Sequence, residues 1–169
     1  MSPIYYSPER AKDYQQQTMA SSLVKIDIHL IFHVKSTSVN MRGEDLSRIF
    51  QYLGGVIQGM DAIPIEVGGM CDHIHILTSL PKSMTLIDFV RNIKVASSKW
   101  IKQVDSYYAH FAWQDGYGAF SVSPTLLDKT INYIRKQEEH HKKRSFRDEY
   151  KLFLEHYGIN YDERYVFND

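Results

Sequence analysis

The sequence predicts an α+β fold built from a long strand, a helix, a β-hairpin and a second helix. Residues 23–35 and 68–77 alternate between apolar and other side chains, which is the period of a strand. Residues 44–60 and 85–102 instead repeat their apolar side chains at helical spacing. A strand at 62–69 leads by a short turn into the strand that carries His73 and His75, so these two strands are expected to pair as a hairpin.

Size and composition indicate one globular domain. The chain has 169 residues, of which 43% are hydrophobic and 24% are charged, as in ordinary globular proteins. We expect residues 1–21, which are polar and include a glutamine run at 15–17, to form a flexible N-terminal arm. Residues 22–169 are expected to form the single domain, including its C-terminal tail.

Several classes of protein are disfavoured by the same composition. No apolar run approaches the roughly 20 residues that cross a bilayer, so no membrane span is expected. The single cysteine, Cys71, cannot form an internal disulfide, which favours a cytoplasmic location. A formal net charge of zero argues mildly against a generic nucleic-acid binder, although the charge is unevenly distributed.

The first strand, at residues 23–35, presents two different faces. We interpret one face as core, and it carries Val24, Ile26, Ile28, Leu30, Phe32 and Val34. The other face is mostly polar and could line a site; it carries Lys25, Asp27, His29, Ile31, His33 and Lys35. We interpret His29 and His33 as facing solvent, although both could join the histidines of the later strand.

The remaining elements follow from caps and periodicity. Ser83 or Thr85 is expected to cap the helix at 85–102, and residues 119–123 read as a short strand. Ser123 and the proline after it are expected to start a helix that continues past residue 137. Ser145 caps a last helix that Gly158 ends, and the tail at 159–167 is a strand or a strap over the core.

Two histidines offer a metal site. His73 and His75 are two apart on a strand, so their imidazoles project from one face and can converge on a divalent ion. Asp72 precedes them and could orient a ligand or act as a third one. The alternative is a strand with a solvent-exposed face that carries two histidines incidentally.

Two further groups suit nucleic-acid chemistry. Tyr133 and Gln137 lie one helical turn apart, so a phenol and an amide can address one point; the alternative for the tyrosine is a half-buried aromatic at a helix edge. A cationic stripe on the helix at 85–102 and a later cluster could contact phosphates, although a solvated face is the commoner case. Their members are Arg91, Lys94 and Lys102 in the stripe, and Lys142, Lys143 and Arg144 in the cluster.

Together these segments resemble a known family. The Asp-His-Ile-His-Ile sequence at residues 72–76 resembles the histidine–hydrophobic–histidine strand of the HUH nucleases. Residues 133–141 look like the catalytic helix of the single-tyrosine transposases of small bacterial insertion sequences, a group with REP-associated relatives. Residues 113–121 are similar to the segment that precedes this helix, and the resemblance covers residues 23–167.

The resemblance implies a fold, a reaction and roles. The fold would be an antiparallel sheet flanked by helices, similar to a ferredoxin-like or RNA-recognition-motif layer. Tyr133 would be the nucleophile, and His73, His75 and Gln137 would bind Mg²⁺ or Mn²⁺. The protein would be a homodimer that cleaves and rejoins single-stranded DNA at insertion-sequence ends, recognises DNA hairpins, and passes through a 5′-phosphotyrosine. The tyrosine helix of one subunit can complete the site of the other.

Three other functions remain open on sequence grounds. A domesticated relative would bind or nick chromosomal hairpins without moving DNA. A metal-dependent phosphoesterase would release its product by water attack and would tolerate Tyr133→Phe. A structural dimer module, in which the histidines are incidental, would bind no metal.

Overall fold

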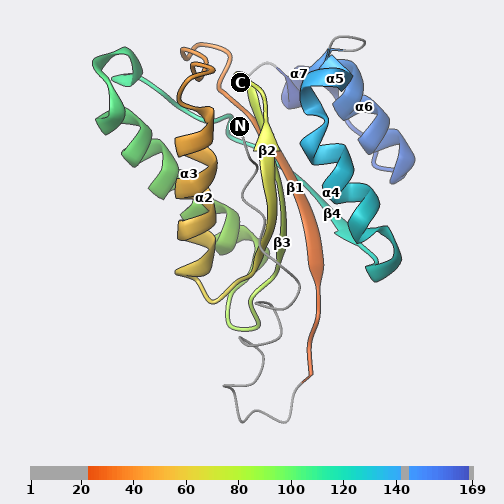
Figure 1. The fold of residues 1–169 in the computed structure, drawn as a ribbon. Coiled ribbons are helices and arrows are strands. Elements are labelled where there is room, and N and C mark those ends of the chain that lie inside the picture. The colour runs from red at the N-terminus through yellow and green to blue at the C-terminus, as the bar shows by residue number, and fades with distance from the viewer. Residues whose placement is uncertain (1–22, 142–144, 168–169) are drawn as a thin grey trace.

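A central sheet lies between two layers of helices (Figure 1). The computed structural model describes residues 23–141 and 145–167. The predicted arm at 1–21 and the cluster of Lys142, Lys143 and Arg144 lie outside the described residues. Helices α2 and α3 lie on one side of the sheet, and α4 to α7 lie on the other.

The sheet has four strands, and every neighbouring pair is antiparallel. The strands are β1 (Asp27–His33), β2 (Pro64–Gly69), β3 (His73–Ser79) and β4 (Gly118–Val122), in the spatial order β2-β3-β1-β4. With one helix after β1 and one after β3, this is the order of a ferredoxin-like fold. The predicted α+β class, the hairpin and the short fourth strand are therefore confirmed.

The first helical layer buries the larger apolar core. Helix α2 (Leu46–Gln58) and helix α3 (Leu86–Val104) pack on the sheet face that carries Leu30, Ile74 and Ile76. The Thr85 hydroxyl accepts the backbone N–H of Asp88, so the predicted cap of the second helix is confirmed. No helix in the described ranges is both long and apolar enough to span a bilayer.

The second helical layer differs from its predicted form at two places. A 3₁₀ turn follows Ser123, and Lys136 separates α4 (Leu127–Arg135) from α5 (Gln137–His141). The prediction of one continuous helix in this region was therefore wrong. Helix α6 (Phe146–His156) has the predicted Ser145 cap, and Gly158 follows it with a positive φ of 64°. Over residues 159–167 the tail forms the short helix α7 (Glu163–Val166) and no strand. Its Tyr161, Val166 and Phe167 pack against the core, as the alternative of a strap predicted.

The first strand is buried on both faces, which corrects the interpretation of its histidines. His29 is 2% exposed and His33 is 8% exposed, so neither faces solvent. The strand is also shorter than predicted, because its first residue, Asp27, pairs with the last residue of β3, Ser79. The second helical layer covers the histidine face, and alternation along one strand could not reveal that cover.

Candidate metal and tyrosine site

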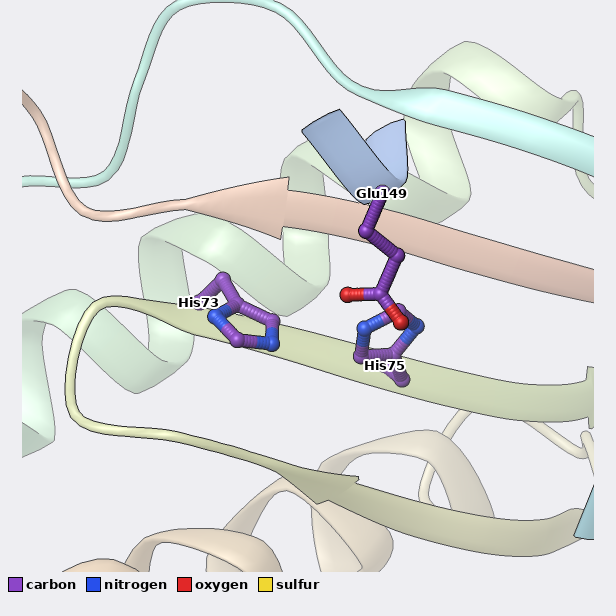
Figure 2. Close-up of side chains that lie close together, drawn as sticks. All are labelled: His73, His75 and Glu149. Atoms are coloured by element: carbon purple, nitrogen blue, oxygen red, sulfur yellow. The ribbon is translucent and has the colours of Figure 1, made fainter. Parts of the chain in front are cut away.

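The site is built on β3, where His73 and His75 lie side by side on one sheet face. Their ring centroids are 5.1 Å apart, and both side chains are fully buried. On β1, His33 pairs with His73 and Ile31 pairs with His75, so the odd-numbered residues of both strands share this face. Figure 2 shows the two imidazoles along the strand, with Glu149 above them.

Each histidine is oriented by a second side chain. The Nδ1 atom of His73 donates to Oδ1 of Asp72 over 2.7 Å, as predicted for an orienting carboxylate. The Nδ1 atom of His75 lies 2.9 Å from Nε2 of His29. Burial lowers the pKa of His29 to about 3, so this ring is neutral near pH 7 and can accept the proton of His75. In both arrangements the orienting side chain contacts Nδ1, so a cation would be bound through Nε2 of each imidazole.

The contact to His29 leads to a first prediction. His29→Phe keeps a ring but removes the acceptor, and loss of such an orienting group weakens metal binding by roughly 10- to 100-fold. We expect this fall in Mn²⁺ affinity in isothermal titration calorimetry, with thermal melts to verify folding. His29→Gln retains an oxygen that can accept the hydrogen bond, so its Mn²⁺ affinity should fall less than that of His29→Phe. Equal affinities for wild type and His29→Phe would contradict the orienting role.

Gln137 enters the cluster from α5. It is 2% exposed, and its Oε1 atom lies 3.1 Å from Nε2 of His73. An amide oxygen only accepts, and the His73 tautomer with its only proton on Nδ1 would present a lone pair at Nε2. Two lone pairs that face each other at this distance suit an ion between them. The geometry thus fits the predicted ligand set of His73, His75 and Gln137.

Tyr133 lies beside the same histidines and belongs to the same chain. Its ring centroid is 5.7 Å from that of His75 and 6.2 Å from that of His29. Phe153 of α6 packs against the tyrosine edge to face at 5.5 Å. The side chain is half-buried, whereas His73 and His75 are fully buried. The structure therefore brings Tyr133, Gln137 and both histidines together.

Helix α4 is fixed to β2 by two neighbouring contacts. Ile134 lies against Gly68, where an added Cβ would come within 2.8 Å of the isoleucine side chain. One residue on, Arg135 donates from Nε to Oε2 of the buried Glu66 over 3.0 Å. A side chain at Gly68 would push the helix away, so this glycine allows Tyr133 to approach the histidines. Neither contact was visible from local sequence patterns.

Glu149 of α6 is a member of the cluster that sequence reasoning missed. A carboxylate oxygen and one nitrogen each of His73 and His75 all lie within 4.8 Å of one another. Burial is the main cause that raises the pKa of Glu149 to about 7. The position of Glu149 in the sequence could have indicated that it faces inward. It lies three residues after Phe146 and one before Tyr150, on the apolar side of α6.

The predicted cationic stripe lies in the other helical layer. Arg91 pairs with Asp88 at 2.8 Å, and Lys102 is exposed on the same helix, α3. Lys94 donates to the carbonyl oxygens of Gln114 and Gly116 over 2.6 and 2.7 Å, so it also holds the loop that precedes β4. The three cations line a groove of about 830 Å³ on the sheet side opposite the histidines. Their contact with DNA stays a prediction.

The donor set suits a divalent ion. Imidazole nitrogens bind transition ions, and amide and carboxylate oxygens favour Mg²⁺ and Mn²⁺. In the described part of the chain, two imidazoles, one amide and one carboxylate converge at this point. The structure thus contains a possible His-His-Glu metal site.

Sequence comparison relates this chain to transposases. The family model described as "Transposase IS200 like" matches residues 22–137, more than half of the chain. The ISDra2 transposase TnpA of Deinococcus radiodurans is 25% identical over 122 residues, covering 68% of this chain and 86% of that protein.

A solved structure shows a similar fold. A transposase candidate from Deinococcus radiodurans R1 superposes with a TM-score of 0.56 at 19% identity, covering 72% of this chain and 98% of that one. A REP-associated tyrosine transposase bound to a REP hairpin has a TM-score of 0.47 at 14% identity, covering 75% of this chain and 74% of that one.

Proposed function

This chain belongs to the IS200-like transposase family, and we propose that it cleaves and rejoins single-stranded DNA through a covalent bond to Tyr133. One observation carries the proposal: the Tyr133 ring lies 5.7 Å from that of His75, within a cluster suited to a divalent ion. A phenol beside a phosphate-binding cation is the combination that tyrosine-dependent phosphoryl transfer requires.

The reaction begins with attack of the Tyr133 oxygen on the phosphorus of the scissile phosphodiester. An oxygen–phosphorus bond to tyrosine forms, and the bond from phosphorus to the 3′ oxygen breaks. The phenol loses one proton and the departing 3′ oxygen gains one, so the step is balanced. The product is a 5′-phosphotyrosine and a free 3′ hydroxyl. A 3′ hydroxyl of another strand reverses the step and joins new DNA without ATP.

The residues of the cluster divide the remaining tasks. His73, His75 and Gln137 would hold Mg²⁺ or Mn²⁺, which withdraws negative charge from a non-bridging phosphate oxygen. Asp72 and His29 keep the two imidazoles in their binding tautomers. Tyr133 is the more exposed member of the cluster, so DNA would approach the histidines from its side.

We also propose the partners that the family resemblance implies. The DNA would contain single-stranded segments and hairpins at the ends of an insertion sequence, and the active protein would be a homodimer. The histidines and Tyr133 of one chain already lie together, which supports a site completed within that chain. Exchange of the tyrosine helix between subunits is the other possible arrangement.

An end-labelling experiment tests this function. The protein is mixed with Mn²⁺ or Mg²⁺ and a single-stranded oligonucleotide from its native genomic flanks, labelled at either the 5′ or the 3′ end. On a denaturing gel, the 3′ label should move to the size of the protein, and the 5′ label should appear on a short free fragment. Chelation of the metal should abolish both changes.

Other results would favour the alternative functions. Two free fragments without a covalent adduct would indicate hydrolysis by a phosphoesterase. Hairpin binding without cleavage would indicate a domesticated binding protein. The absence of both DNA binding and metal binding would leave a structural role.

The cationic stripe on α3 gives a second prediction. We propose that Arg91 and Lys102, together with Lys94, contact phosphates of the DNA at a distance from the cleaved position, because all three line one groove on the sheet side opposite Tyr133. Each phosphate contact contributes about 0.7 to the salt slope of single-strand binding. Changing Arg91 and Lys102 to alanine should flatten the slope by about 1.4 in fluorescence anisotropy. An unchanged slope would contradict their role.

A further inference from the structure

Glu149 reaches the histidine cluster from a helix outside the residues that the family model matches. The match ends at Gln137, and Glu149 lies on α6, twelve positions later in the sequence. Its side chain is directed from that helix toward His73 and His75 (Figure 2). The residue is 8% exposed, so its carboxylate is largely removed from water.

The packing of α6 holds this carboxylate in place. Phe146 stacks on the His73 ring at 4.4 Å, and Phe153 packs edge to face on His29 at 5.3 Å. Between them, Tyr150 lies over Gly118, where an added Cβ would come within 2.6 Å of the phenol oxygen. One helix face therefore anchors to both central strands and places Glu149 above the histidines.

Glu149 also determines how the Gln137 amide is oriented. The Nε2 group of Gln137 donates to Oε1 of Glu149 over 3.2 Å. The other end of the amide, Oε1, is then directed toward Nε2 of His73 at 3.1 Å. A carboxylate only accepts when ionised, so this pairing turns the amide oxygen toward the ion position.

We propose that Glu149 is a fourth protein ligand of the divalent ion that His73, His75 and Gln137 would hold. The inference rests on the metal centre of the proposed function. A carboxylate supplies a formal negative charge that neither imidazole nor amide provides, so it strengthens the attraction for a dication. It also raises the number of oxygen donors from one to two, which suits Mg²⁺ and Mn²⁺ better than a set dominated by nitrogen.

Calorimetric titration with Mn²⁺ tests the proposal. Glu149→Gln keeps the shape of the side chain but removes the charge, and its Mn²⁺ affinity should fall by more than about tenfold. Glu149→Asp, which has a shorter side chain, should bind Mn²⁺ with an affinity between those of Glu149→Gln and wild type. Glu155→Gln, an exposed position on the same helix, is the matched control and should bind as wild type does. Circular dichroism melts verify that the variants fold.

A double-mutant cycle separates a ligand from a residue that acts only through Gln137. In the background of Gln137→Ala, Glu149→Gln should still weaken Mn²⁺ binding. Mn²⁺ should also slow amide hydrogen exchange in α6 of the wild type more than in Glu149→Gln, because the ligand ties this helix to the ion. Loss of the effect in the Gln137→Ala background would overturn the ligand role.

The failure of this inference differs from failure of the proposed function. If His75→Ala abolishes Mn²⁺ binding and Glu149→Gln binds as wild type does, the metal centre stands without Glu149. If the wild type binds Mn²⁺ no better than His75→Ala does, the metal centre itself is refuted, and the role of Glu149 with it.

Discussion

Replacing Tyr133 with phenylalanine is expected to abolish the covalent protein–DNA adduct and to lower the rate of cleavage by on the order of 10³-fold or more. The variant keeps the ring that packs against His75 and Phe153 and removes only the attacking oxygen. The end-labelling gel measures the loss, and Mn²⁺ titration should show that metal binding remains.

Tyr157→Phe is the matched control for this prediction. Tyr157 is exposed, its hydroxyl donates to the carbonyl oxygen of Ser121, and its ring packs against Phe120. The variant should form the adduct at the wild-type rate. Cleavage that survives in Tyr133→Phe at an undiminished rate would favour water as the nucleophile and would contradict the tyrosine mechanism.

The second large effect is expected for His75→Ala. Removal of this imidazole takes away a ligand, and loss of about 4 kcal/mol of charge stabilisation by the ion corresponds to about a 1,000-fold lower cleavage rate. Calorimetry should show weakened Mn²⁺ binding in the same variant, while hairpin binding measured by anisotropy should persist. Chelation of the metal from wild type should reproduce the loss of cleavage.

An exposed histidine supplies the control for His75. His110 lies outside the cluster on the surface, and His110→Ala should bind Mn²⁺ and cleave DNA as wild type does. Because His75 is fully buried, melting curves must show that the alanine variant remains folded. A folded His75→Ala that cleaves at the wild-type rate would contradict a role for the metal in the reaction.

Local patterns predicted the elements and most of the candidate site. Strand alternation placed His73 and His75 on one face, and hydroxyl caps at Thr85 and Ser145 marked two helix starts. These features depend on near neighbours in the sequence, so they can be read without the fold. The family resemblance then connected the histidine strand with Tyr133 and Gln137, which the structure brings together.

The features that were missed depend on contacts between distant segments. The break at Lys136 has no glycine or proline to signal it; it lies between Arg135, which pairs with Glu66, and Gln137, which enters the cluster. His29 was interpreted as facing solvent because alternation cannot show that helices cover the second face. Glu149 resembled any polar residue of an amphipathic helix until the packing of α6 was known.

Mass spectrometry of the trapped adduct tests the central claim most directly. The protein is incubated with single-stranded DNA from its native flanks and Mn²⁺, denatured, and digested with nuclease and protease. Nucleotides joined through a 5′ phosphate to the peptide that contains Tyr133 are the result predicted here. Attachment at another residue, or cleaved DNA with no modified peptide, would contradict the role of Tyr133 as the nucleophile.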